Sequence, residues 1–173
     1  MGSAVDVRTL IDAHYESLYR YAYRLSGRAT DAEDLTQETF GKVIPRLGQL
    51  REPDRVKGWL FRILRNAYLH KVRDERRGSF VPLEAVGDFA AEDSPAAETL
   101  DVDPAKVQVA LNELDETFRT PLILFYFEEF SYRDIAEQMD LPIGTVMSRL
   151  ARAKTYLRAK LSPGKDSDGL PAR

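Results

Sequence analysis

The stretch from Leu141 to Lys165 carries side chains suited to binding DNA. It has six Lys or Arg residues and no acid. Apolar residues recur in it at positions 146, 150, 153, 157 and 161, which is helical spacing. At about 100° per residue, Ser148 and Arg152 lie on the opposite side of this helix. A helix with one packed side and with small polar and cationic groups on the other fits a DNA major groove.

A short helix is predicted directly before this one, so the two form a helix-turn-helix. Ser131 and Asp134 have the spacing of an N-terminal capping box. Asp140 tolerates the left-handed conformation of a tight turn, and Pro142 suits the start of a helix. A basic amphipathic helix can also be a solvated surface, and charge alone does not separate the two interpretations. The capping box, the turn and the basic second helix together favour DNA binding.

Residues 54–77 carry a second group of cations, which alternate with aromatic residues such as Trp59 and Phe61. Basic grooves with stacking surfaces bind single-stranded bases. The alternative is that the two aromatic residues belong to the core. The candidates for phosphate neutralisation are Lys57, Arg62, Arg65, Lys71, Arg73, Arg76 and Arg77.

Asp31, Asp34 and Glu38 form an acidic helix edge, because they lie three and four residues apart. This edge is either a protein-binding surface or the solvated face of an ordinary amphipathic helix. A metal site is disfavoured, since no His lies at ligand spacing. His14 and His70, the two histidines of the chain, have no nucleophile or ligand partner at a telling spacing. We therefore expect no enzyme activity, no cofactor and no metal.

The elements that must position these groups all have helical periodicity, which predicts an all-α fold. We expect two small helical domains joined by a flexible acidic linker, with the helix-turn-helix in the C-terminal one. Gly27 is predicted to end the first helix, and Thr30 to begin the second as a capping box with Glu33. Pro121 is placed in the first turn of a later helix. The ranges are 1–78 for the first domain, 79–103 for the linker, 104–162 for the second domain and 163–173 for a disordered tail.

The charge distribution supports this division. The net charge of −3 over 173 residues conceals a cationic first domain, because residues 1–80 hold fifteen cations and eleven acids. Residues 81–105 hold seven acids and no Lys or Arg. The absence of Cys excludes disulfides and thiolate metal sites within the chain. No signal peptide or membrane-spanning run is apparent, so we expect a cytoplasmic protein without direct membrane insertion.

Three segments in this order resemble the extracytoplasmic-function sigma factors, the smallest members of the sigma-70 superfamily. They are DAEDLTQETFGKV at 31–43, GWLFRILRNAYLHKVRDERR at 58–77, and LNELDETFRTPLILFYFEEFSYRDIAEQMDLPIGTVMSRLARAK at 111–154. The resemblance implies a bacterial protein that binds core RNA polymerase and directs it to promoters. It also implies an anti-sigma partner, often membrane-anchored, which would retain the chain at the inner membrane.

The resemblance assigns a role to each segment. Polymerase binding falls to Asp34, Leu35, Gln37, Glu38 and Phe40, the two apolar residues being partly core. Capture of the melted minus-ten strand falls to Lys57, Trp59, Arg62, Arg65 and Asn66. Binding of the minus-thirty-five duplex falls to Thr145, Met147, Ser148, Arg149, Ala151, Arg152, Lys154 and Arg158. Met147 replaces a residue that is usually basic in relatives, which predicts different groove contacts.

A stand-alone helix-turn-helix repressor or activator is the alternative function. Such a protein would bind duplex promoter DNA by itself. The sequence favours a sigma factor, because the segments at 31–43 and 48–77 would have no role in a repressor.

Overall fold

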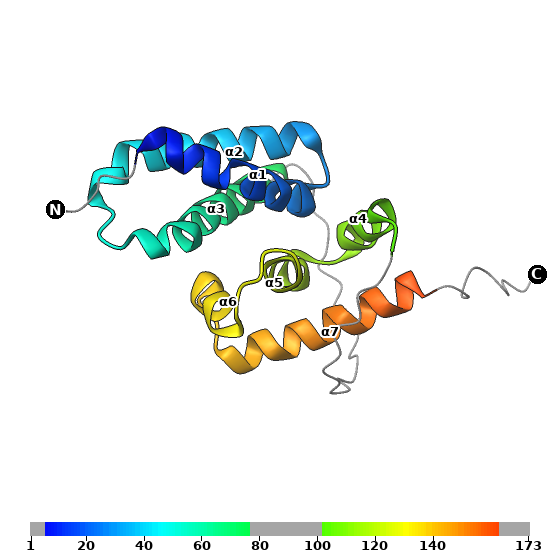
Figure 1. Ribbon diagram of the computed structural model, residues 1–173. Coiled ribbons are helices and arrows are strands. Elements are labelled where there is room, and N and C mark those ends of the chain that lie inside the picture. The colour runs from blue at the N-terminus through cyan, green and yellow to red at the C-terminus, as the bar shows by residue number, and fades with distance from the viewer. Residues whose placement is uncertain (1–5, 77–101, 163–173) are drawn as a thin grey trace, which may run out of the picture.

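The computed structural model describes residues 6–76 and 102–162, which form seven α-helices and two short 3-10 helices (Figure 1). No strand occurs in these two ranges, so the predicted all-α class is confirmed. The predicted acidic linker lies outside the described residues except for Val102 and Asp103, and the predicted tail at 163–173 lies wholly outside them.

The N-terminal unit is a group of three long helices. It contains α1 (Val7–Ser26), α2 (Ala29–Val43), the 3-10 helices η1 (Ile44–Gln49) and η2 (Pro53–Arg55), and α3 (Val56–Arg76). Gly27 follows α1 with φ of 72°, a left-handed conformation that glycine adopts without strain. The predicted end of the first helix is therefore confirmed.

The start of α2 differs from the sequence prediction. The helix begins at Ala29, one residue before Thr30, and its N-cap residue Arg28 makes no side-chain capping bond. The predicted capping box of Thr30 with Glu33 is therefore wrong. Asp31 in the first turn puts a carboxylate near the positive end of the helix dipole, which stabilises this end without a capping box.

The C-terminal unit contains four helices: α4 (Pro104–Glu113), α5 (Glu116–Tyr126), α6 (Tyr132–Met139) and α7 (Ile143–Leu161). Asp103 and Asp115 cap α4 and α5 by accepting bonds from backbone N–H groups. Because α5 begins at Glu116, Pro121 lies inside the helix, and its predicted place in the first turn is wrong.

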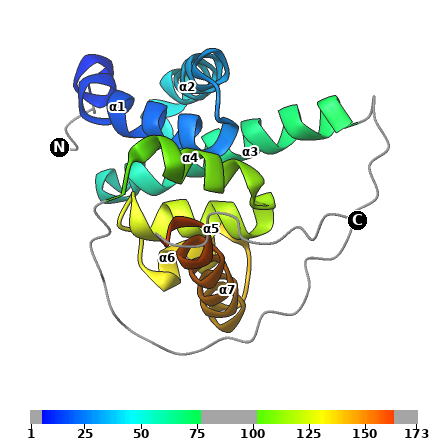
Figure 2. The ribbon, with the colours of Figure 1, turned by 90° about the vertical axis from the view of Figure 1, so that its right-hand side faces the viewer.

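The two units pack against each other through α1 and α3 on one side and α4, α5 and α6 on the other (Figure 2). Helix α5 lies between the N-terminal helices and α7. The core continues across this junction, where the ring of Phe61 lies 4.9 Å from that of Tyr21 and 5.2 Å from that of Phe130. All three side chains are buried, so the contact between the units is partly hydrophobic.

Candidate nucleic-acid and protein interfaces

Helices α6 and α7 form the predicted helix-turn-helix. Ser131 Oγ accepts a hydrogen bond from the backbone N–H of Asp134 at 3.1 Å, and Asp134 Oδ2 accepts one from the N–H of Ser131 at 3.2 Å. This capping box fixes the start of α6, as the sequence predicts. Asp140 ends α6 with φ of 52°, which confirms the predicted left-handed turn.

Helix α7 has one buried side and one exposed side. Val146, Leu150 and Ala153 are buried, whereas Met147 and Ser148 are exposed. The predicted orientation of the helix is confirmed by this burial pattern. The other residues assigned to duplex DNA are half-buried or exposed: Thr145, Arg149, Ala151, Arg152, Lys154 and Arg158.

The C-terminal part of α7 is tied to α4. Tyr156 donates a hydrogen bond from its hydroxyl to Glu113 at 2.6 Å, and Lys160 Nζ lies 2.8 Å from the same carboxylate. The bond from Lys160 is the main reason why the pKa of Glu113 lies below its ordinary value. These contacts orient α7 on the unit that carries it.

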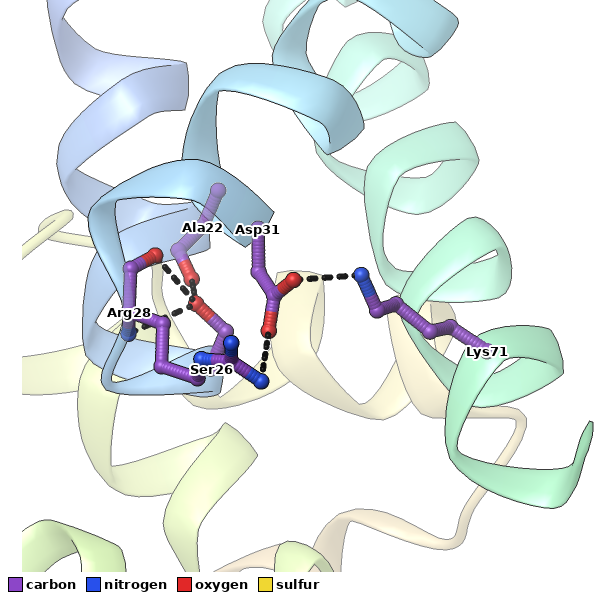
Figure 3. Close-up of polar contacts among 5 residues, drawn as sticks. All are labelled: Ala22, Ser26, Arg28, Asp31 and Lys71. Carbon is purple, nitrogen blue, oxygen red and sulfur yellow. Dashed lines mark hydrogen bonds and ion pairs between the residues drawn. The ribbon is translucent and has the colours of Figure 1, made fainter. Parts of the chain in front are cut away.

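Asp31 is a structural residue of the acidic helix edge (Figure 3). Its carboxylate accepts a hydrogen bond from Lys71 Nζ on α3 and lies 3.8 Å from the guanidinium of Arg28. Its side chain is 13% exposed, so it is largely shielded from a partner. Next to it, Ser26 Oγ donates to the carbonyl oxygen of Ala22 at 2.8 Å at the end of α1.

The rest of the edge presents polar side chains to solvent. Asp34, Gln37 and Glu38 are exposed, and Glu38 pairs with Lys42 one turn later on the same helix. Leu35 and Phe40 are only 2% and 6% exposed, because both belong to the core. The core role that the sequence predicts for them in part is confirmed, because both side chains support α2 from the buried side.

Helix α3 carries the residues assigned to the melted strand. Lys57, Trp59 and Arg65 are half-buried, and Arg62 and Asn66 are exposed. Phe61, for which the sequence left open a stacking or a core role, is fully buried. The open question is thus settled in favour of the core for this residue.

Three of these cations contact the C-terminal unit. Lys57 Nζ donates to the backbone carbonyl oxygen of Glu128 at 2.8 Å. Arg62 Nη2 lies 3.1 Å from Asp140 Oδ2, and Arg65 Nη2 lies 3.6 Å from Glu116 Oε1. Sequence reasoning missed these pairs, because the partners are 51 to 78 residues apart and no local pattern connects them.

A cavity of about 460 Å³ lies where α3 approaches α6. Gly58, Trp59 and Arg62 line it from the N-terminal unit, and Phe130 and Gln138 from the C-terminal one. Gln138 Nε2 donates to the carbonyl oxygen of Gly58 at 2.5 Å. A Cβ atom on Gly58 would lie 3.3 Å from that amide nitrogen, so the glycine permits this close approach.

Glu128 is a buried carboxylate at the same junction and is 4% exposed. Burial raises its pKa to about 7, since a charged carboxylate is poorly solvated there. The cations Arg20, Lys57 and Arg24 oppose this rise in pKa, and Glu129 adds to it. The sequence gives no sign of this behaviour, which depends on packing between the two units.

With this geometry described, the chain can be compared with known proteins. Residues 10–78 match the family described as Sigma-70 region 2, and residues 97–157 match Sigma-70, region 4. EcfG of Rhodopseudomonas palustris, an ECF RNA polymerase sigma factor, is 33% identical over 156 residues, which cover 90% of this chain and 84% of the relative. SigE of Mycolicibacterium smegmatis, another ECF RNA polymerase sigma factor, is 38% identical over 156 residues. That match covers 88% of this chain and spans 60% of the length of SigE.

Solved structures show the same arrangement of helices. The sigma factor RpoE in complex with the anti-sigma factor NepR from Bartonella quintana matches with a TM-score of 0.71 and 29% identity, over 88% of this chain and 94% of that one. CnrH, solved with the cytosolic domain of CnrY, shares the fold with a TM-score of 0.64 at 24% identity, over 91% and 88% of the two chains. The chain belongs to the extracytoplasmic-function sigma factors of the sigma-70 family. None of its described helices has the length and apolar content needed to span a bilayer.

Proposed function

We propose that the chain binds core RNA polymerase and directs it to promoters by contacting two DNA elements. The observation that carries this proposal is that a sigma-70 region 2 and a sigma-70 region 4 follow each other in one chain. The promoter then has to meet both units, because each carries a different group of DNA-binding side chains. The proposal places the chain in the bacterial cytoplasm, where polymerase acts.

The polymerase-binding surface in this proposal is the exposed edge of α2. Asp34, Gln37 and Glu38 point to solvent there. Carboxylates pair well with Arg on a partner, and an amide can both donate and accept hydrogen bonds. The buried Leu35 and Phe40 keep α2 in place, so the polar side chains are presented by a rigid helix.

Helix α3 is proposed to capture the melted minus-ten strand. Its cations would neutralise phosphates, Trp59 would stack on a base, and the exposed amide of Asn66 would read a base edge. Captured bases offset the free energy of unpairing, which is a few kcal/mol per disrupted step. Strand opening in this scheme needs no nucleotide hydrolysis by the chain.

Helix α7 is proposed to enter the major groove of the minus-thirty-five element. Ser148 and Arg152 would contact base edges, and Arg149, Lys154 and Arg158 would contact phosphates. Met147 is 50% exposed and offers an apolar contact for a thymine methyl group.

An anti-sigma factor is a further proposed partner. The supporting observation is the similarity to RpoE, which was solved with the anti-sigma factor NepR. Such a protein would compete with polymerase for the exposed edge of α2. If it were anchored in the membrane, it would hold the chain there.

Charge reversal on α2 tests the proposed function. We expect Asp34→Lys with Glu38→Lys to abolish co-purification with core polymerase, because like charges would then face the cations of the partner. Glu33→Lys is the matched control, since Glu33 is exposed on the same helix beside the assigned edge. Unchanged binding of the double variant would refute the interface. Tight binding of the unmodified chain alone to duplex promoter DNA would instead support the repressor alternative.

A further inference from the structure

We propose that Ile143 and Met147 make recognition of the minus-thirty-five element depend on the 5-methyl groups of thymines. This inference rests on the proposed function and names the feature of the bases that the start of α7 recognises. Met147 is one of the residues proposed to face the minus-thirty-five duplex, and Ile143 adds a second apolar side chain one turn earlier. We call these two side chains the apolar pair.

The apolar pair lies on the surface of α7 and outside the core. Ile143 and Met147 are each 50% exposed, whereas Val146 and Leu150 on the same helix are buried. The two exposed side chains lie four residues apart, so they are neighbours on one face of the helix. Half-buried Ala151 continues this apolar stripe one turn later. The pair is therefore available to a ligand.

The apolar pair occupies the part of a recognition helix that reaches base edges. In helix-turn-helix proteins, the N-terminal residues of the second helix contact bases in the major groove. Ile143 is the first residue of α7, and Met147 lies one turn further along it. A Cβ atom added to Gly144, next to Ile143, would meet no atom of another residue within 4 Å. The space beside the pair is therefore open, and the first turn can approach the bases closely.

The charges around the apolar pair favour DNA over a protein as its ligand. Helix α7 carries five Lys or Arg residues and no Asp or Glu. Two of these cations, Lys154 and Arg158, follow Met147 along the same side of the helix. Such a positive surface attracts a polyanion. The apolar group that base pairs present in the major groove is the 5-methyl group of thymine. Duplex DNA therefore complements both the cations and the pair.

The spacing of the apolar pair matches neighbouring base pairs. Four residues of an α-helix rise by about 6 Å. Successive base pairs lie about 3.4 Å apart along the duplex. Ile143 and Met147 can therefore contact methyl groups on base pairs that are one or two steps apart.

The apolar pair also disfavours G·C base pairs at these positions. In the major groove guanine presents two acceptors and cytosine presents an amino group. Ile143 has no hydrogen-bonding group, and Met147 has only a weakly accepting sulfur atom. A G·C pair facing them would lose hydrogen bonds to water without replacement. The preference for thymine thus combines an attraction for one base pair with a penalty on the other.

Replacement of thymine by deoxyuridine tests the inference without changing the protein. Deoxyuridine keeps the hydrogen-bonding groups of thymine and lacks only the 5-methyl group. The complex of the chain with core polymerase first selects its preferred sequences from promoter fragments with a randomised minus-thirty-five region. Its affinity is then measured on a selected promoter with deoxyuridine at one position at a time. We expect about fourfold weaker binding at each of two base pairs, one or two steps apart, which corresponds to about 0.8 kcal/mol per methyl group.

Substitutions in the chain assign the two methyl contacts. Ile143→Ala and Met147→Ala should each abolish the effect of deoxyuridine at one of the two base pairs and retain it at the other. Val109→Ala is the matched control and should retain both effects, because Val109 is 59% exposed on α4, away from the proposed DNA surface.

A second base analogue provides an independent measurement. Where a thymine of the selected element is replaced by cytosine, 5-methylcytosine restores the methyl group at the same ring position. We expect the polymerase complex to bind the methylated duplex about fourfold more tightly than the duplex with cytosine.

Equal affinity for thymine and deoxyuridine at every position of the selected element would overturn the inference. Retention of both methyl effects by the two alanine variants would also overturn it. Loss of co-purification of these variants with core polymerase would show that the pair contacts protein instead of DNA, and would overturn it as well. Failure of the unmodified chain to bind polymerase, or to select any minus-thirty-five sequence with it, would refute the proposed function, so the two failures are distinguishable.

Discussion

Lys57 Nζ lies 2.8 Å from the backbone carbonyl oxygen of Glu128, and this bond joins the start of α3 to the turn between α5 and α6. The same ammonium lies 5.0 Å from the ring centre of Phe130. A cation that we assign to DNA therefore rests on the C-terminal unit. The bond also holds a backbone position next to the buried carboxylate of Glu128, which makes the junction sensitive to pH.

We predict that the contact between the units weakens as pH rises. The pKa of Glu128 is about 7 while the two units are packed together, and it would return toward the ordinary value of 4.5 if the carboxyl became exposed to water. The protonated carboxyl of Glu128 stabilises the packing of the two units. This stabilisation is fully present below about pH 4.5 and is lost as pH rises through 7. Each unit of difference in pKa corresponds to about 1.4 kcal/mol. Fluorescence energy transfer between dyes at positions 55 and 137, measured from pH 5 to pH 8, would detect the change.

Substitutions at the turn provide the control for this measurement. Glu128→Gln removes the titrating group, so energy transfer should stay high across the pH range. Glu129→Gln changes the exposed neighbour and should retain the dependence on pH. An unchanged pH profile in Glu128→Gln would assign the titration to another group.

Acids on α2 are predicted to differ in role. Asp31→Asn should lower the free energy of unfolding by about 1 kcal/mol, because its partly shielded contact with Lys71 is lost. Binding to core polymerase should be unaffected at a temperature where the variant is folded. Urea unfolding and co-purification measure the two effects separately. A loss of polymerase binding by folded Asp31→Asn would place this residue in the interface instead.

Phe61 and Trp59, two aromatic residues of α3, are also predicted to differ in role. Phe61→Ala should lower the free energy of unfolding by about 3–5 kcal/mol, the usual cost of removing a large buried side chain. Trp59→Ala should cost less stability, since the side chain is half-buried, and should reduce binding of single-stranded DNA in the polymerase complex. Thermal unfolding and strand-binding assays would test the pair. Equal effects on stability would show that Trp59 is also a core residue.

Cations on α7 should have distinct signatures in DNA binding. Arg152→Ala is expected to relax sequence preference in the minus-thirty-five element at a cost of about 1–3 kcal/mol, as for loss of a bidentate base contact. Arg158→Ala should weaken binding to all sequences and lower the slope of log affinity against log salt by about 0.9. Competition and salt titrations with the polymerase complex measure both. Identical behaviour of the two variants would contradict their separate assignment.

Local signals in the sequence predicted local structure well. Gly27, the Ser131–Asp134 capping box and Asp140 each act within a few residues, and the structure has all three features. The two errors in helix starts have identifiable reasons. At Thr30 the first turn is held through Asp31 by Lys71 on another helix. At Pro121 the helix starts five residues earlier than the proline, because Asp115 caps it.

Relations between distant residues could not be predicted. The sequence predicts that Asp31, Asp34 and Glu38 form one acidic surface on α2. In the structure Asp31 is instead bonded to Lys71, which lies forty residues away in sequence. Leu35 and Phe40 were predictable as core residues in part, and the structure buries both of them on the same side of α2 as Val43. The contacts between α3 and the C-terminal unit depend on how the two units pack, and no periodic pattern within either unit predicts them.

The central claim is tested most directly by in vitro transcription with purified chain, sigma-free core polymerase and a library of bacterial promoter fragments. The account predicts transcripts that start at defined positions on a subset of fragments and that depend on addition of the chain. Absence of such transcripts, with core polymerase that a different sigma factor activates in parallel, would contradict it.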